Sequence, residues 1–232
     1  MKRVTKLSTR IVTAIAAATG FATPFQVTAQ VRQDRQLWVN FSAQGELGKR
    51  KVWVAEVQPR LARNLSVPSV LLGRMAVGYE VNDRITIYQG FVYQELLDGA
   101  TRHEKRSYQQ ADLDVASGTW GTLKARLRLE QRWFSNGSEM GLRFREQLRY
   151  EKALTVNEEP LVGVLTAEAF ANVLTADYGA RRGFESARLF AGVRIPIDEQ
   201  STETGYQAQI SAPPGDERRL DHVLLVTFRL RP

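Results

Sequence analysis

The sequence predicts an all-β fold: an antiparallel up-and-down transmembrane β-barrel that follows a cleaved signal peptide. Apolar and polar residues alternate with a period of two over many short segments, as they do in β-strands. The polar faces of these segments carry long charged side chains of both signs. The first residues of the chain also have the composition of a secretion signal.

The predicted signal peptide covers residues 1–29. Lys2, Arg3, Lys6 and Arg10 form a basic region, an apolar run covers residues 11–22, and residues 27–29 offer small side chains at the cleavage position. A membrane-spanning helix needs about 20 apolar residues, and this run is shorter and interrupted. We therefore expect two parts, a signal peptide over residues 1–29 and a single β-barrel domain over residues 30–232.

The charge balance argues against nucleic acid as a partner. The whole chain has a net charge of +7, and residues 1–29 contain four basic and no acidic residues. The remainder has 28 basic and 25 acidic residues, a net charge of +3, and these charges are interleaved rather than clustered. The chain has no cysteine, and no metal-ligand or phosphate-binding motif is present. We expect no cofactor.

The clearest strand pattern lies at residues 123–133. One face carries Leu123, Ala125, Leu127, Leu129 and Trp133, and the other carries Lys124, Arg126, Arg128, Glu130 and Arg132. Rows of arginine and glutamate satisfy one another's hydrogen bonds in a narrow lumen, and aromatic residues near segment ends are typical of membrane interfaces. We therefore predict apolar side chains facing lipid and charged ones facing inward. A soluble periplasmic ligand-binding β-barrel, with the apolar face inside, is the alternative.

Eleven segments qualify as strands. They are residues 36–43, 51–58, 71–81, 84–96, 101–114, 122–134, 140–152, 161–170, 186–197, 204–211 and 221–231. Turns are expected at residues 45–48 and around Asn82, and Pro59 and Pro68 are expected to bracket a loop. Single-chain bacterial outer-membrane barrels have even strand counts. We therefore predict ten strands, with the polar segment 101–114 as an excursion at one rim, and keep twelve as the alternative.

One residue conflicts with the predicted lipid-facing surface. Glu146 shares a face with Leu142, Phe144 and Leu148. A charge in this position costs up to a few kcal/mol at the bilayer midplane. A β-bulge near residues 145–147 would reset the alternation. Gln89 and Gln131 are uncharged polar residues that conflict with the predicted lipid-facing surface in the same way, but less strongly.

Several motifs resemble a known family. The chain has RLRLEQRW at residues 126–133 and RFREQLRY at residues 143–150, followed by Glu168 with Phe170 and Asn172, then Arg188 to Gly192, Tyr206, Gln209 and His222. This order of motifs resembles the bacterial family called domain of unknown function 2490. The resemblance covers nearly all of residues 30–232. It implies an outer-membrane β-barrel of Gram-negative bacteria and no established activity.

Catalytic chemistry has little support in the sequence. The two histidines are His103 and His222. Asp221 adjoins His222, but adjacent strand residues point to opposite faces, so it is badly placed to orient the imidazole. Asp112 and Asp114 share a face without further acidic ligands at suitable spacing. We expect no enzymatic activity, and keep a membrane-embedded hydrolase using His103 or His222 as the alternative.

The candidate functional residues are therefore the charged side chains assigned to the lumen. They are Glu56, Arg126, Arg128, Glu130, Arg132, Arg143, Arg145, Arg149, Glu151, Glu168, Arg188 and Arg194. In a small barrel such pairs fill and rigidify the interior, or line a narrow channel that excess arginine biases toward anions. We expect a narrow channel or an envelope-structural protein in the outer membrane, with lipid and a small anionic solute as its partners.

Overall fold

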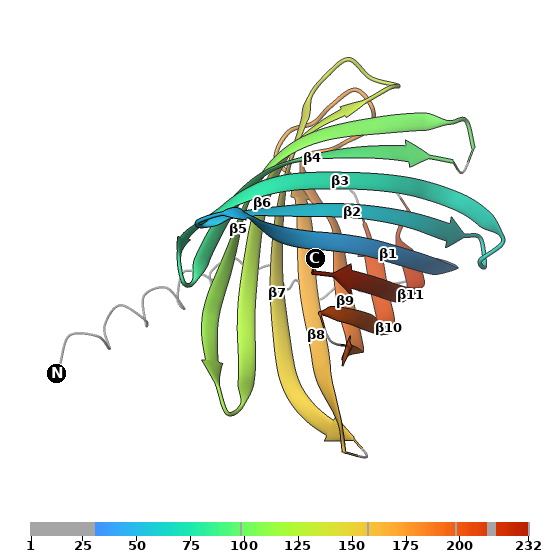
Figure 1. The fold of residues 1–232 in the computed structure, drawn as a ribbon. Helices are drawn as coiled ribbons and strands as arrows, with labels where there is room; N and C mark the ends of the chain where they lie inside the picture. The colour runs from blue at the N-terminus through green and yellow to red at the C-terminus, as the bar shows by residue number, and fades with distance from the viewer. Residues whose placement is uncertain (1–30, 98, 157, 198, 213–216, 232) are drawn as a thin grey trace. The chain divides into compact units, whose positions relative to one another are not determined.

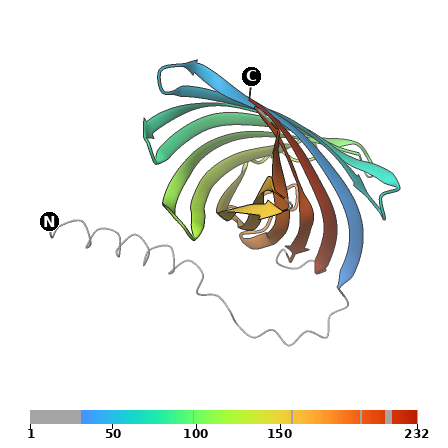
Figure 2. The same cartoon turned by 60° about the horizontal axis from the view of Figure 1, so that its bottom comes forward.

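The computed structural model describes residues 31–97, 99–156, 158–197, 199–212 and 217–231. These residues form one closed β-barrel of eleven strands (Figures 1 and 2). The predicted signal peptide lies outside the described residues. Within the described ranges, no helix has the length and apolar composition needed to cross a membrane.

The strands follow one another along the chain without intervening helices. They are β1 (Arg32–Gly48), β2 (Lys51–Ala62), β3 (Val67–Asn82), β4 (Ile85–Leu96), β5 (Arg102–Gly118), β6 (Gly121–Phe134), β7 (Gly141–Val156), β8 (Glu159–Asn172), β9 (Gly183–Ile197), β10 (Gln200–Ser211) and β11 (Arg219–Leu230). Their lengths run from 12 to 17 residues. All eleven are therefore longer than the ~9–11 residues that cross a bilayer.

Each strand pairs with its sequence neighbours, and the barrel closes between β1 and β11. All neighbouring pairs are antiparallel except this closing pair, which is parallel, with Trp38 opposite Leu225. The prediction of ten strands was wrong. Because eleven is odd, the first and last strands run in the same direction, so β1 begins and β11 ends at opposite ends of the barrel.

The strand that the prediction of ten left out is β5. Its residues were predicted to form an excursion at one rim. It pairs along its length with β4 and β6. The pattern failed here because both faces of β5 are polar. Glu104 and Arg106 face inward and are buried, whereas the outward Gln109 donates to Gln89 and accepts from Gln131.

Two strand boundaries also differ from the prediction. β2 continues through Pro59, which pairs with Leu71, so Pro59 does not bound a loop. Proline favours an extended conformation in the residue before it, which is compatible with a strand. β1 runs to Gly48, and the turn falls at residues 49–50 rather than 45–48. The turn predicted at Asn82 is confirmed, and the Asn82 side chain accepts a hydrogen bond from the Arg84 amide.

The two ends of the barrel differ in their connections. At the end where β1 begins, the connecting segments are residues 63–66, 97–101, 135–140, 173–182 and 212–218. We call this the long-loop end. At the other end, called the short-turn end, each connection has two residues: 49–50, 83–84, 119–120, 157–158 and 198–199.

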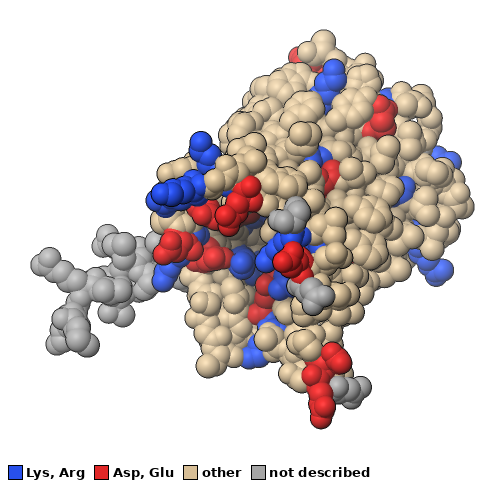
Figure 3. Space-filling view, viewed as in Figure 1, with Lys and Arg blue, Asp and Glu red and all other residues tan. Residues whose placement is uncertain are grey.

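The barrel wall is apolar outside and charged inside. Leu127 is 37% exposed on the outer wall, whereas its neighbour Arg128 is 3% exposed. Met75, Leu189 and Leu224 are among the many large apolar side chains exposed on the outer wall. On the face shown in Figure 3, much of the wall is free of charged side chains, and blue and red atoms gather in a central band.

The register between β6 and β7 is continuous, so no bulge resets the alternation near Glu146. Leu127 pairs with Glu146 and Arg128 pairs with Arg145. Glu146 therefore lies on the same outward side as Phe144, as the sequence pattern indicated.

A small apolar cluster occupies part of the interior. Leu72, Ala76, Val92 and Tyr108 are buried together. The Tyr108 ring lies across Gly90, with which it is in register, and a Cβ at Gly90 would approach the ring to 2.2 Å. Glycine at this position makes room for the ring, and the packing fixes the relative position of β4 and β5.

Candidate functional site: the charged lumen

Nine charged residues form a continuous series of ion pairs across the lumen, which we call the central chain. In order of contact they are Arg106, Glu104, Arg132, Glu185, Arg143, Glu130, Arg145, Glu168 and Arg188. They come from β5, β6, β7, β8 and β9. The chain thus cross-links five strands from the inside.

Every carboxylate of the central chain is shared by at least two arginines, and Glu130 has a third, Arg128, at 3.6 Å. Glu130 is fully buried and lies 2.5 Å from Arg143 Nη2 and 2.8 Å from Arg145 Nη1. Glu185 joins Arg132 at 3.0 Å to Arg143 at 2.7 Å. Shared, charge-assisted hydrogen bonds of this kind satisfy most acceptor positions of a buried carboxylate.

A second series lies nearer the short-turn end, and we call it the short-turn chain. It consists of Arg194, Glu151, Arg149, Glu203 and Arg229. Arg149 lies 2.7 Å from Glu151, and Arg229 lies 3.0 Å from Glu203. This series also begins and ends on an arginine. Its links join β7, β9, β10 and β11.

The two chains border a cavity of about 790 Å³ inside the barrel. Among the described residues, thirteen arginines and one lysine line it, against seven carboxylates. The lumen is therefore electropositive. An excess of charges of one sign between low-dielectric walls raises the local concentration of ions of the opposite sign.

All twelve residues assigned to the lumen from the sequence face the interior. Eleven of them line the cavity, and the twelfth, Glu130, is buried behind it. Arg126 pairs with Asp112 at 3.2 Å. Arg128 stacks on Tyr108, with its guanidinium carbon 4.3 Å from the ring centroid, and hydrogen-bonds Gln110.

Several charged residues of the lumen were missed in the sequence. They are Arg60, Arg74, Glu104, Arg106, Glu185, Glu203 and Arg229. Arg60 continues the alternation of Glu56 and Gln58 past Pro59, so the period-two signal was present there. Glu104 and Arg106 lie in the segment judged too polar to be a strand. Glu185 lies near the beginning of β9, before the predicted boundary.

At the long-loop end, the connection between β8 and β9 is fixed to the connection between β6 and β7. Asp177 accepts hydrogen bonds from the backbone amide of Ser138 at 2.7 Å and from that of Glu139 at 3.2 Å. The Ser138 bond is the main cause of a lowered pKa at the Asp177 carboxyl. The Tyr178 ring packs on Phe134 with centroids 4.3 Å apart, and burial raises the pKa of the Tyr178 hydroxyl.

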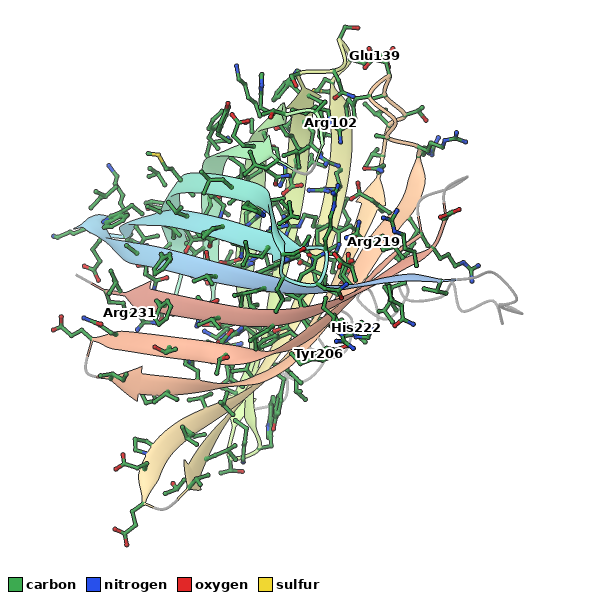
Figure 4. The ribbon with its side chains drawn as sticks, turned by 90° about the vertical axis from the view of Figure 1, so that its right-hand side faces the viewer. Arg102, Glu139, Tyr206, Arg219, His222 and Arg231 are labelled. Carbon is green, nitrogen blue, oxygen red and sulfur yellow. The ribbon has the colours of Figure 1, made fainter. Side chains whose placement is uncertain are left out.

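Both histidines lie on the outer wall rather than in the lumen. His222 and Tyr206 lie side by side on neighbouring strands (Figure 4), with Tyr206 Oη 2.7 Å from His222 Nδ1. His103 stacks on Tyr93 with ring centroids 5.9 Å apart. Asp221 faces inward and is buried, so it does not orient His222. Among the described residues, no group of three or more metal-ligating side chains is present.

Taken together, these features define a closed β-barrel with an ion-paired, electropositive interior. Residues 35–219 match the family described as protein of unknown function (DUF2490). The chain belongs to this family. It is 35% identical over 214 residues to an uncharacterized protein of Methylorubrum extorquens, an alignment covering 90% of this chain and 93% of that protein. No solved structure matches the chain.

Proposed function

We propose that this protein is a bacterial outer-membrane β-barrel whose lumen gives small anions a narrow passage. The observation that carries the proposal is that apolar side chains lie on the outside of the wall and charged side chains on the inside, the reverse of a water-soluble barrel. Leu189 and Leu224 are each more than half exposed on the outside, whereas Glu104 and Glu130 are fully buried inside. A water-soluble barrel places its apolar side chains inward, but a lipid-facing barrel alternates apolar-out and polar-in.

Two further features support the membrane location. A closed barrel leaves no unpaired strand edge, which is a requirement for strands in a bilayer. The export signal predicted at residues 1–29 supports a destination beyond the inner membrane. Outer-membrane lipid is then the partner of the outer wall. The proposal includes no enzymatic activity, no cofactor and no nucleic acid.

The bias toward anions follows from the composition of the lumen. Basic side chains on the cavity surface outnumber carboxylates two to one. Rings of arginine and lysine select anions in pores. The cavity is small and is crossed by the central chain, so only small solutes fit.

Planar-bilayer recording of the refolded protein tests the passage. We expect small single-channel conductances and, in a salt gradient, a reversal potential shifted toward the Nernst potential of the anion. Replacing Arg149 with glutamine lowers the anion preference, because it removes a cation from the cavity surface. A cation-selective pore contradicts the proposed mechanism.

A purely structural role in the envelope is the second candidate. The observation that favours it is the central chain itself, which links five strands through buried ion pairs. In this case the refolded barrel inserts into vesicles and conducts no ions at any voltage. If the protein is recovered in the soluble fraction without detergent, both membrane functions are refuted and the soluble ligand-binding barrel takes their place.

A further inference from the structure

Arg60 is a lumen arginine without an ion-pair partner among the described residues. Its guanidinium group donates two hydrogen bonds to Gln58 Oε1, at 2.8 and 2.6 Å. Its guanidinium carbon lies 3.8 Å from the centroid of the Trp38 ring. An amide oxygen and an aromatic ring carry only partial negative charge, so they do not neutralise the arginine.

A second arginine reaches the same indole. The guanidinium carbon of Arg188 lies 5.0 Å from the Trp38 ring centroid. Arg188 ends the central chain, and its only described ion pair is the loosest link of that chain, 3.5 Å from Glu168. Its shorter hydrogen bond, at 2.7 Å, is to the amide oxygen of Gln209.

The carboxylates nearest to this pair are already held by other arginines. Glu168 lies 2.7 Å from Arg145, and Glu56 is paired with Arg74. Asp221, on β11, lies 2.6 Å from Arg219. The positive charge of Arg60 and Arg188 is therefore not balanced by the carboxylates around them.

Three buried polar atoms of residues lining the same cavity lack hydrogen-bond partners, and one of them, Asn40 Oδ1, is an acceptor. The other two, Gln207 Nε2 and Thr166 Oγ1, can donate a hydrogen bond. The Gln207 side chain lines the cavity and the residue is only 6% exposed. Gln207 and Thr166 flank Phe190 in register on neighbouring strands, and Arg188 lies two residues from Phe190 on the same inward face. Buried donors without partners are rare in folded proteins.

We propose that this part of the lumen, formed by Trp38, Arg60, Thr166, Arg188 and Gln207, is a binding site for a small oxyanion, either a carboxylate or a phosphate. Arginine binds both through paired N–H groups. An oxyanion supplies the missing charge and accepts the bonds that the Gln207 amide and the Thr166 hydroxyl have available. The site deepens the proposed function, because it names the class of anion that the lumen holds.

Binding is measured on the refolded full chain in detergent micelles, so the result does not depend on conductance. The protein is titrated with sodium acetate, sodium phosphate and sodium chloride at constant ionic strength, and intrinsic fluorescence is followed. Trp38 is the buried reporter, and its replacement by phenylalanine shows which part of the signal it contributes. We expect saturable binding of acetate or phosphate, and weaker binding of chloride, which cannot accept paired bonds.

Three substitutions locate the site. Arg60→Gln and Arg188→Gln weaken oxyanion binding by about tenfold or more, since hydrogen bonds to charged groups contribute that much. Arg194→Gln is the matched control. It removes the same charge from the lumen at the short-turn chain, and we expect less than about a threefold change because the lost interaction is long-range and screened. Circular dichroism confirms that each variant retains the β-barrel.

The outcomes separate this site from the passage. Oxyanion binding without conductance supports the site and refutes the pore. Conductance without saturable oxyanion binding refutes the site and leaves the pore. Equal weakening by Arg60→Gln and Arg194→Gln also refutes the site, because it shows that only diffuse positive charge attracts anions. Preference for chloride over both oxyanions refutes the proposed ligand class.

Discussion

An arginine placed on the outer wall at mid-height provides the sharpest test of the membrane location. Met75 is 69% exposed on β3. It lies eight residues from Val67 and seven from Asn82, the two ends of that strand. At about 3.3 Å per residue these intervals are roughly 23–26 Å along the strand. With a tilt of ~35–45°, they correspond to about 16–22 Å along the normal of a bilayer that the barrel spans. In the proposed membrane-spanning barrel, Met75 is therefore close to the bilayer midplane.

We expect Met75→Arg to lower the free energy of unfolding by about 2–4 kcal/mol in lipid vesicles, the cost of an arginine at the midplane of an outer-membrane barrel. Val81→Arg is the matched control. It lies one residue before the end of the same strand and is also exposed, and we expect a cost of about 0–1 kcal/mol. Guanidinium unfolding in vesicles, followed by tryptophan fluorescence, measures both.

The difference in lost stability between the two positions decides whether the outer wall faces lipid. If the outer wall faces water, both substitutions are ordinary surface changes and shift stability by about 0.5 kcal/mol or less. Equal, small effects at both positions would refute the assignment of the outer wall to lipid, and with it the proposed passage. A larger cost at Val81 than at Met75 would also contradict the placement, since it would put the wrong part of β3 at the midplane.

Three further predictions concern the lumen and one connection. Arg143→Gln removes one of the three arginines that contact the fully buried Glu130 and lowers the free energy of unfolding by about 3–5 kcal/mol in denaturant titrations, whereas Lys124→Gln, which breaks a half-exposed pair, changes it by about 1 kcal/mol or less. Gly90→Ala drives a methyl group into the ring packed across it and costs about 1–3 kcal/mol in the same assay. The hydrogen bond from the Ser138 amide holds the pKa of the Asp177 carboxyl below its ordinary value of 3.8. The stability that this contact contributes is therefore fully present above pH 3.8 and is lost as the pH falls through the lower folded-state pKa. The hydrogen-exchange protection factor of the Ser138 amide should therefore fall in acid, and an Asp177→Asn variant whose protection factor falls in the same way would contradict this cause.

The sequence was sufficient to predict the fold class because strand alternation is a local property. Within residues 123–133, neighbouring side chains go to opposite faces, and the structure places Leu127 outside and Arg128 inside. The all-β barrel class was therefore predictable from local patterns, and the family was predictable from the order of its motifs along the chain. The turn at Asn82 was predictable for the same reason, since its side chain acts within two residues.

Strand number and partner choice were not predictable because they depend on contacts far apart in sequence. β5 is polar on both faces, so it carries no local alternation, and its pairing with β4 and β6 decides that it is a strand. Glu185 meets Arg132 from 53 positions away, and no local pattern indicates that register. Arg60 was missed because Pro59 was taken as the end of a strand that in fact continues to Ala62.

The rigid interior and the anion-attracting interior have one physical cause. A carboxylate donates no hydrogen bond and accepts several, whereas an arginine donates five and accepts none. In both ion-pair chains each carboxylate contacts at least two arginines, and each chain ends on an arginine at both sides. Because terminal arginines such as Arg188 and Arg229 have only one carboxylate neighbour, satisfying every buried carboxylate leaves positive charge in excess. A barrel stabilised in this way is electropositive inside whether or not ions pass through it, so a structural role and an oxyanion site are compatible in the same lumen.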